Sequence, residues 1–424
     1  MQITASTKFT QFIYTYGWWM VALFIFAIPL GKGFEVPLAL MAIGGMILLA
    51  KEGRAVLQGY NMRLALITFA CIWIPIATAL PDAFMFEPTA STALAFLRFP
   101  FAILFALYAL ANTEHRDKLY TAIFAMFTLL IMDGLLQAAT GKNLLGAPMI
   151  GERISGLFYP KLTFGLWVAP FGAIYFEKVR QLSKSSRYGW TYWLLLAPYT
   201  AAVLLSGSRA SWGIYAVGMI GFAVYLYYTN PQRNLKRYLV IAAALTLPLS
   251  FGLYQYPPFK HKVEATEGLF SGDYDKANVA TSIRLPIWIV ALKMSKDHLI
   301  NGVGPRGFRY AYPPYAEKGD FFLQQNPHMG PTHPHQIFLE VLVETGIIGV
   351  IGYFIFLGLI IKLTWQAIRQ HNHHPVPFGI AVLVATMPIN AGIGFYASIL
   401  SAMTWWMLAI FFATLIKPNQ PNTL

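Results

Sequence analysis

Long apolar runs alternate with short polar segments along most of the chain. Helices of roughly 17–25 apolar residues are long enough to cross a bilayer, and the pattern predicts about twelve of them. We place these spans at about 17–30, 36–50, 64–80, 92–111, 120–139, 163–176, 190–205, 212–228, 239–254, 347–365, 378–391 and 399–416. The predicted fold class is therefore an all-α polytopic membrane protein, with a long polar segment between spans nine and ten.

Composition agrees with this class. Hydrophobic residues make up 57% of the chain and charged residues only 12%, with a mean hydropathy of +0.53, whereas soluble domains carry about 25% charged residues. The net charge of +13 is spread over short loops and the long polar segment. Without a basic domain, it favours anionic lipid and phosphate-bearing substrates over nucleic acid.

Cys71, the only cysteine, lies inside an apolar run and excludes both an intrachain disulfide and a thiolate metal site. The first apolar run follows a short polar start without a small-residue cleavage site, so we expect it to be retained as a span.

The charge distribution predicts the orientation of the chain. An even number of spans puts both termini on one side, and lysine and arginine gather in the short loops of that side. Short cytoplasmic loops carry this excess, so the termini are predicted to be cytoplasmic. We divide the chain into spans one to nine (1–256), a large outward loop (257–335), and spans ten to twelve with the tail (336–424).

The outward loop is too long for a simple connector and carries helical signals. Thr281 and Ser282 favour a helix start, and Asn301-Gly302 a stop. Arg284 would lie in the first turn, where the helix dipole disfavours a cation unless an anion is bound. Alternatively, it faces water. The Gly302–Gly307 stretch fits GxGxxG but follows a helix instead of a strand, so it predicts a helix-ending turn or a close approach to a ligand, not a dinucleotide site.

His335 lies where polar sequence becomes apolar, and a helix starting there is expected to lead into the span at 347–365. A histidine can exchange protons near neutral pH, although an interfacial helix cap is the alternative for this residue alone. Arginine forks match phosphate oxygens. The outward cations, which together favour a diphosphate substrate, are Arg153, Lys161, Arg209, Arg284, Arg306 and Arg309.

Arg98 falls inside the predicted span 92–111. A charge within a span is costly and usually faces a cavity or the interior of the bundle, so we expect it to reach the outer site. A structural ion pair is the alternative.

Other chemistries are less well supported. Glu340 and Glu344 share a helix face, but no partner carboxylate completes a glycosidase pair. His333 and His335 lack further ligands for a metal. The histidines at 371, 373 and 374 are predicted to lie in a solvated cytoplasmic loop. A secondary transporter would show paired repeats with broken helices, which are not evident, and a lipid-binding scaffold would not need His335.

One sequence pattern resembles that of O-antigen ligases: His335-Gln336, nine residues, Gly346, two residues, then Gly349. The Ser206-Gly207-Ser208-Arg209 turn resembles the short outer loop of that family, which carries an arginine. The large outer loop of the family resembles the stretch Ser282-Ile283-Arg284 with Trp288, followed by Asn301-Gly302-Val303-Gly304 and Phe308.

The resemblance implies a GT-C-type glycosyltransferase of the bacterial inner membrane, independent of metal and ATP, with a periplasmic active site. It implies transfer of a preformed O-antigen polysaccharide from undecaprenyl diphosphate to lipid A-core, with membrane lipids as neighbours and no nucleic acid. His335 would act as the base. Arg209 and Arg284 would bind the diphosphate and stabilise the leaving group during an inverting attack.

Further donor contacts are expected from Arg153, Lys161, Arg306, Arg98, Trp288 and Gln336. The superfamily also includes O-antigen polymerases and protein O-oligosaccharyltransferases, which stay open as alternatives.

Overall fold

The computed structural model describes residues 7–185, 187–229, 251–252, 254–255 and 257–415, and it is built from helices. The helices before residue 230 are α1 (Lys8–Ala27), α2 (Glu35–Glu52), α3 (Tyr60–Thr78), α4 (Phe86–Phe96), α5 (Arg98–Ala109), α6 (Thr113–Thr140), α7 (Phe164–Val168), α8 (Gly172–Ser183), α9 (Leu196–Leu205) and α10 (Arg209–Thr229). Those after residue 256 are α12 (Pro257–Glu267), α13 (Tyr274–Ala280), α14 (Leu285–Asp297), α15 (Phe308–Ala311), α16 (Phe321–Gln325), α17 (Ile337–Arg369), α18 (Val376–Ala385) and α19 (Ser398–Thr414).

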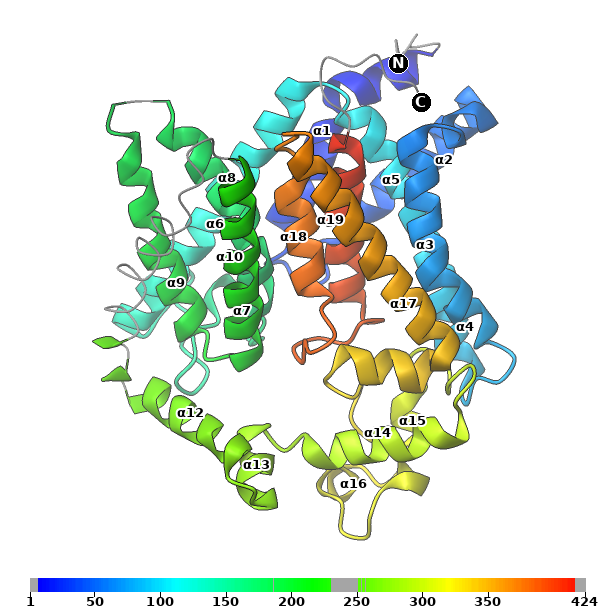
Figure 1. The fold of residues 1–424 in the computed structure, drawn as a ribbon, viewed down its shortest axis with the longest axis vertical. Helices are drawn as coiled ribbons and strands as arrows, with labels where there is room; N and C mark the ends of the chain where they lie inside the picture. The colour runs from blue at the N-terminus through cyan, green and yellow to red at the C-terminus, as the bar shows by residue number, and fades with distance from the viewer. Residues whose placement is uncertain (1–6, 186, 230–250, 253, 256, 416–424) are drawn as a thin grey trace.

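The molecule has two parts, as Figure 1 shows. The long helices stand side by side in a bundle, and α12 to α16 form a layer across one end of it. The start of α1 and the end of α19 lie at the opposite end of the bundle (Figure 1). The polar segment that follows residue 256 is thus a helical layer, folded onto the bundle, instead of a simple connector.

Helix α19 lies at the centre of the bundle. Every residue from Leu400 to Thr414 is buried, and the indole of Trp406 donates a hydrogen bond to the carbonyl of Val21 at 3.0 Å. Helix α5 packs against both α2 and α19. At Gly45 in α2, a Cβ atom would overlap the backbone of Phe101 in α5, so the close contact between these two helices requires glycine.

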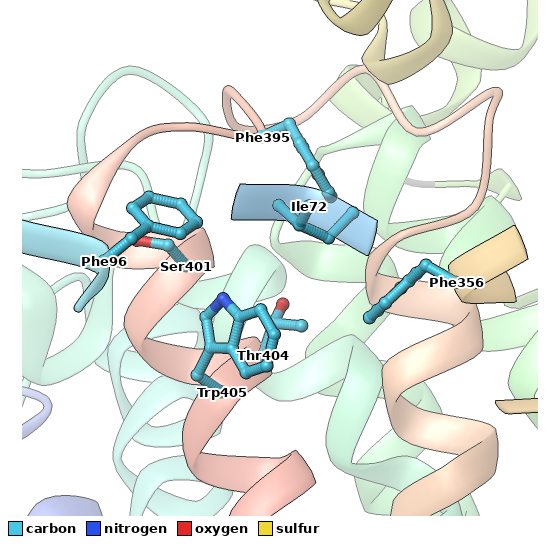
Figure 2. A pocket seen from close by; sticks show the side chains of 7 residues that line it. All are labelled: Ile72, Phe96, Phe356, Phe395, Ser401, Thr404 and Trp405. Atoms are coloured by element: carbon cyan, nitrogen blue, oxygen red, sulfur yellow. The ribbon is translucent and has the colours of Figure 1, made fainter. Parts of the chain in front are cut away.

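The core of the bundle is closely packed. A cavity within it has a volume of about 10 Å³, which suffices for about one water molecule. The residues that line it, shown in Figure 2, are Ile72, Phe96, Phe356, Phe395, Ser401, Thr404 and Trp405. A substrate does not fit there, so the functional site has to be sought elsewhere.

The prediction of a multi-span helical protein is confirmed. Over the described residues, six helices are long and apolar enough to cross a membrane: α1, α3, the continuous stretch of α4 and α5, α6, α10 and α17. Shorter apolar helices are Gly189–Leu205, α18 and α19. The count of about twelve spans and the GT-C type stay predictions. Most of the predicted span 239–254 lies outside the described residues.

Helix α17 departs from the expectation of one continuous helix starting at His335. It begins at Ile337 and breaks at Gly346, whose φ of 62° and ψ of −160° belong to a region that is accessible essentially to glycine alone. In Figure 1, the part before Gly346 lies across the end of the bundle, and the part after it runs through the bundle. The break therefore separates the segment that follows His335 from the membrane span.

The outer layer docks against this break through backbone contacts. The amides of Val303 and Gly304 donate to the carbonyls of Val343 and Glu344 at 2.9 and 3.0 Å, and the amide of Ile347 donates to Leu299. At Gly346, a Cβ atom would fall on the carbonyl of Ile300. The glycine turn after α14 thus approaches the backbone of α17, which agrees with rejecting the dinucleotide interpretation.

The predicted helix in the outer loop is present as α14, but it is shorter than the sequence pattern indicates. It starts at Leu285 instead of at the Thr281–Ser282 signal, because Ser282 and Ile283 both adopt a φ of 61°. Its apolar face, which includes Ile287, Ala291 and Met294, is buried in a small core shared with the first part of α17. The layer therefore has a hydrophobic core of its own.

Candidate functional site

The backbone around His335 is held on several sides. Its amide donates to the Nδ1 atom of His333 at 2.9 Å, and the indole of Trp288 donates to the carbonyl of Pro334 at 3.0 Å. Gln336 follows as the N-cap of α17, where its side chain accepts a hydrogen bond from the amide of Leu339. His335 itself adopts a φ of 54°, a strained conformation of the kind that clusters at functional sites.

The imidazole of His335 lies in the field of Arg284. Burial, and then the charge of Arg284, lower the pKa of His335 to about 4. Burial, together with His335, Arg306 and Arg284, also holds the pKa of His333 well below its usual range. Both rings are therefore neutral at pH 7 and able to accept a proton. In the described part of the chain, the Nδ1 atom of His335 has no hydrogen-bond partner.

Two strained residues present Arg284 to the site. Ser282 and Ile283 follow the end of α13, and both have a φ of 61°, which is unusual for serine and strongly disfavoured for a β-branched residue. The amide of Ile283 donates to the carbonyl of Asn278 at 2.8 Å. Arg284 then becomes the N-cap of α14, one residue before the first turn in which the sequence placed it.

Arg209 joins three elements. It begins α10, and its guanidinium donates to the hydroxyl of Ser282 at 2.8 Å and to that of Thr266 in α12 at 3.4 Å. Burial, and then the charge of Arg209, lower the pKa of Arg284. Arg209 and Arg284 therefore lie close enough to act on the same anion.

Two more cations face the turn before Arg209. The Nε atom of Arg153 donates to the carbonyl of Ser206 at 2.8 Å, and the Nζ atom of Lys262 donates to that of Gly207 at 2.9 Å. Burial, followed by the charges of Arg153 and Arg209, lowers the pKa of Lys262 to about 8. Burial is the larger cause of this downward shift, and repulsion from the neighbouring cations adds to it.

None of these cations forms an ion pair with a carboxylate of the described residues. Among the described residues, none of the ion pairs involves Arg153, Arg209, Lys262 or Arg284. A group of partly buried positive charges without paired carboxylates favours the binding of an anion. Three of its members are arginines, whose planar forks suit phosphate oxygens. We call the four residues the cation cluster.

Arg306, at a φ of 69°, lies near His333 and is held by its backbone. Its amide donates to the buried carboxylate of Glu344 at 2.9 Å. Glu340, one turn earlier in α17, accepts a hydrogen bond from the amide of Phe395 at 2.8 Å. Both glutamates therefore anchor backbone segments around the histidines, and they do not form a glycosidase pair.

The two glycines of the His335 pattern have separate structural roles. Gly346 breaks α17 and allows Ile300 to approach. Gly349 lies against Thr345, whose hydroxyl interacts with that of Tyr396 at 2.8 Å, and a Cβ atom at Gly349 would overlap the Thr345 side chain. The spacing therefore fixes the short helical segment between His335 and the span.

The structure brings some predicted residues together and leaves others apart. His335, Arg284, Arg209, Arg153, Arg306, Trp288 and Gln336 lie in one connected region. Lys161 is exposed, and Arg98 pairs with Glu35 at 2.6 Å. In the described residues, neither Lys161 nor Arg98 has a side-chain hydrogen bond or ion pair to the His335 region. Their roles in substrate binding stay predictions.

Sequence reasoning did not single out Lys262. It considered Ser282 only as a helix start and as part of the family pattern, and His333 only as a metal ligand. The one available signal was the spacing of His333 two residues before His335. The described residues contain no cluster of three or more His, Cys, Asp or Glu placed to hold a metal ion, and metal independence stays a prediction.

The prediction of a solvated loop for the second histidine cluster is wrong for His373. Its Nδ1 atom lies 2.8 Å from the hydroxyl of Tyr225, which donates to the buried carboxylate of Glu177 at 3.2 Å. Arg180 pairs with the same carboxylate. These residues form a polar connection between α8, α10 and the turn before α18.

One comparison with known proteins covers most of this site. Residues 192–354 match the family model described as O-antigen ligase. The matched stretch contains Arg209, Lys262, Arg284 and His335, whereas Arg153 precedes it. A comparison with curated proteins found no match. The stretch 192–354 of this multi-pass membrane protein, together with the site residues that it contains, is therefore similar to the O-antigen ligase family.

Proposed function

We propose that the protein is an O-antigen ligase, which transfers a preformed O-antigen polysaccharide from undecaprenyl diphosphate to lipid A-core during lipopolysaccharide biosynthesis. The observation that carries the proposal is the position of Arg284. On one side Arg209 donates to the hydroxyl of Ser282, two residues before Arg284. On the other side the indole of Trp288, in the first turn after Arg284, donates to the carbonyl of Pro334, next to His335. The charge of Arg284 also lowers the pKa of His335. A neutral base thus lies beside cations that form no ion pair within the described part of the chain, and the family match supports the same chemistry.

The geometry supports a direct displacement. The diphosphate of the donor binds Arg209 and Arg284, and His335 takes the proton from the acceptor hydroxyl. The acceptor oxygen forms a bond to the anomeric carbon while the bond from that carbon to the diphosphate oxygen breaks. The configuration inverts, and undecaprenyl diphosphate leaves. Donors fixed in this way at a developing charge are commonly worth about 2.7–4 kcal/mol each.

The same cations assist the base. Before the donor binds, Arg284 disfavours the protonated form of His335. The bound diphosphate offsets this charge, and the imidazolium that forms during the reaction then lies beside an anion. Proton transfer to His335 therefore becomes easier once the donor is in place, which couples donor binding to activation of the acceptor.

The arrangement of the chain supports a site on the periplasmic face of the bacterial inner membrane, with both termini cytoplasmic. The layer of α12 to α16 lies at the end of the bundle opposite the start of α1 and the end of α19 (Figure 1). The excess of basic residues in the short loops on the terminal side supports the same orientation. The donor carries its own leaving group, so the proposed reaction uses neither ATP nor a metal.

A reconstituted transfer assay tests the proposal. Purified protein is incubated with a defined undecaprenyl-diphosphate-linked glycan and lipid A-core in the presence of EDTA, as wild type, His335→Ala and His328→Ala. His328 is an exposed histidine of the same loop and serves as the matched control. We expect transfer of the whole glycan to lipid A-core by the wild type and by His328→Ala, and loss of transfer in His335→Ala with the fold intact.

The other outcomes each overturn a stated part. Extension of one donor glycan by another identifies a polymerase, and transfer to an added acceptor protein identifies a protein O-oligosaccharyltransferase. Full activity of His335→Ala removes His335 from the mechanism. If the protein transfers glycan to none of these acceptors, the proposal that it is an enzyme is overturned, and a secondary transporter becomes the better interpretation.

A further inference from the structure

The turn before α10 holds two cations from distant parts of the chain. Arg153 and Lys262 donate to the carbonyls of neighbouring residues, Ser206 and Gly207, at 2.8 and 2.9 Å. Arg153 comes from the segment between α6 and α7, and Lys262 comes from the middle of α12. Both side chains are partly exposed, so each keeps access to a ligand while its position is fixed by the turn.

Gly207 allows Arg153 and Lys262 to approach the same turn. It adopts a φ of 62°, and a Cβ atom at this position would overlap Nζ of Lys262 and lie 2.9 Å from Cγ of Arg153. Any side chain at Gly207 would therefore displace one of the two cations. The turn is open at the point where the cations converge.

The charge of Lys262 is poorly compensated. Arg153 and Arg209 act to lower its pKa, and Glu152 is the carboxylate that opposes them. Lys260, on the same helix, pairs with Glu264 at 3.7 Å, whereas Lys262 has no ion pair among the described residues. An anion bound at the turn would relieve the repulsion among the three cations.

Arg209 connects this turn to Arg284. The hydroxyl of Thr266 accepts a hydrogen bond from Arg209 and donates one to the carbonyl of Lys262 at 2.8 Å. On its other side, Arg209 donates to Ser282, two residues before Arg284. The order along the site is therefore His335, Arg284, Arg209, and then Arg153 with Lys262.

We propose that Lys262 and Arg153 form a half-site for the donor phosphate nearest the prenyl chain, while Arg284 binds the phosphate that carries the sugar. This inference rests on the proposed function. Arg209 lies between the two half-sites and contacts both phosphates. The sugar end of the donor thus points to His335, and the lipid end points to the turn between α9 and α10.

An aromatic pair marks the lipid end. Trp212, one turn after Arg209 in α10, packs against Phe259, one turn before Lys262 in α12, with ring centroids 5.0 Å apart. The indole of Trp212 donates to the carbonyl of Leu204, so its apolar ring face is fixed beside the cations. This pair offers an apolar surface to the first isoprene units of the donor.

Binding measurements without acceptor test the half-site. The affinities of purified wild type, Lys262→Met, Lys262→Arg and Arg284→Met for undecaprenyl monophosphate and undecaprenyl diphosphate are compared in detergent micelles. Lys260→Met on the same helix is the matched control. The monophosphate lipid carries only the phosphate nearest the prenyl chain, so it reports on the proposed half-site alone. Thermal unfolding of each variant verifies that the fold is retained.

We expect Lys262→Met to weaken binding of both lipids by about 10- to 100-fold, the size of one charge-assisted hydrogen bond. Lys262→Arg restores part of this loss. Arg284→Met weakens binding of the diphosphate lipid and leaves the monophosphate lipid unchanged, and Lys260→Met binds both lipids as the wild type does.

The half-site is overturned if Lys262→Met binds the monophosphate lipid as tightly as Lys260→Met. The proposed orientation of the donor is overturned if Arg284→Met weakens binding of the monophosphate lipid as strongly as Lys262→Met does. Either result leaves the proposed function standing when the wild type still transfers glycan to lipid A-core. If the wild type binds neither lipid, the proposal that the donor is a prenyl diphosphate is overturned, and the half-site with it.

Discussion

The Nδ1 atom of His333 accepts the backbone amide hydrogen of His335 at 2.9 Å, and the centroids of the two rings lie 4.0 Å apart. This hydrogen bond holds His335 at its φ of 54°. His333 is held in turn by close packing, since a Cβ atom at Gly394 would lie 3.0 Å from its ring. His333 is therefore a positioning residue for the proposed base.

Replacing His333 by alanine is expected to reduce kcat by about 100-fold, because a displacement of the base by about 1 Å has an effect of that size. The KM for the donor should change little, since the cation cluster is untouched. His333→Asn should recover much of kcat, because its side-chain oxygen can accept the same amide hydrogen. Steady-state kinetics of glycan transfer measure both constants.

The positioning role is contradicted by equal losses in His333→Asn and His333→Ala. It is also contradicted if His333→Ala raises the donor KM while kcat is retained, because this would place His333 in donor binding.

The pKa of His335 predicts an acid limb far below the usual range for histidine. A pKa lowered to about 4 means that the neutral base persists to lower pH, so activity is present above about 4 and is lost as the pH falls through that value. The profile of kcat/KM for the donor reports the free enzyme and should show this limb.

With saturating donor, the limb in kcat/KM for the acceptor should move to higher pH, because the bound diphosphate stabilises the imidazolium. Recovery of activity after return to pH 7 serves as the control for acid unfolding. A donor limb near 6.5, the ordinary value for histidine, would show that neither burial nor Arg284 acts on His335 as described.

Titration of Lys262 predicts a second pH dependence, a loss of donor affinity at alkaline pH. Its pKa of about 8 is lowered by burial, Arg153 and Arg209, and is raised by Glu152. The protonated form binds phosphate, so donor affinity should be highest below about 8 and should decline as the pH rises above it. The decline should be absent in Lys262→Arg, which stays charged. The Kd for undecaprenyl diphosphate, measured from pH 7 to 10, distinguishes the wild type from Lys262→Arg.

Gly346→Ala is expected to destabilise the protein by about 1–3 kcal/mol through backbone strain, with a further loss because the new methyl group meets the carbonyl of Ile300. Gly358 offers the matched control. It lies in the same helix, and a Cβ atom there meets nothing within 4 Å, so Gly358→Ala should stabilise the helix by about 0.5–1 kcal/mol. The Tm of the purified proteins measures the contrast.

Glycan transfer should also fall in Gly346→Ala, because the break in α17 is where the outer layer docks. Equal Tm values for the two alanine variants would show that the break does not depend on glycine.

The sequence predicted those features that depend on local patterns. Apolar runs predicted the helices, and the pattern around His335 predicted the similarity to O-antigen ligases and a region of cations around one histidine. The break in α17 was not predicted, because an isolated glycine in an apolar run does not reveal that Ile300, 46 residues earlier, approaches it. The late start of α14 was missed because serine and isoleucine rarely adopt a positive φ.

Lys262 and Arg98 illustrate the limit for charged residues. Lys260 and Lys262 look alike in the sequence, and only the folded chain shows that one pairs with Glu264 and the other reaches Gly207. Similarly, a single arginine in an apolar run gives no indication of whether its partner is a substrate or Glu35, which precedes it by 63 positions. Long-range pairing of this kind is a property of packing and not of local sequence.

The ion pair of Arg98 and Glu35 provides a test of these two roles for the arginine. Both side chains are about one quarter exposed and lie 2.6 Å apart, so the pair is intermediate between an exposed and a buried one. Arg98→Met and Glu35→Gln are each expected to cost roughly 1–3 kcal/mol of stability. The double variant should lose less than the sum of the two, because the single changes remove the same interaction. Thermal unfolding of the four proteins gives the coupling.

Kinetics then separate structure from function at this position. If the role of Arg98 is structural, the donor KM of both single variants should equal that of the wild type at a temperature where each is folded, since neither residue contacts the cation cluster in the described structure. A tenfold rise in donor KM in Arg98→Met, without the same rise in Glu35→Gln, would instead place this arginine in the donor site, as its position within a predicted span first suggested. Additive losses of stability would show that the pair does not hold α2 and α5 together.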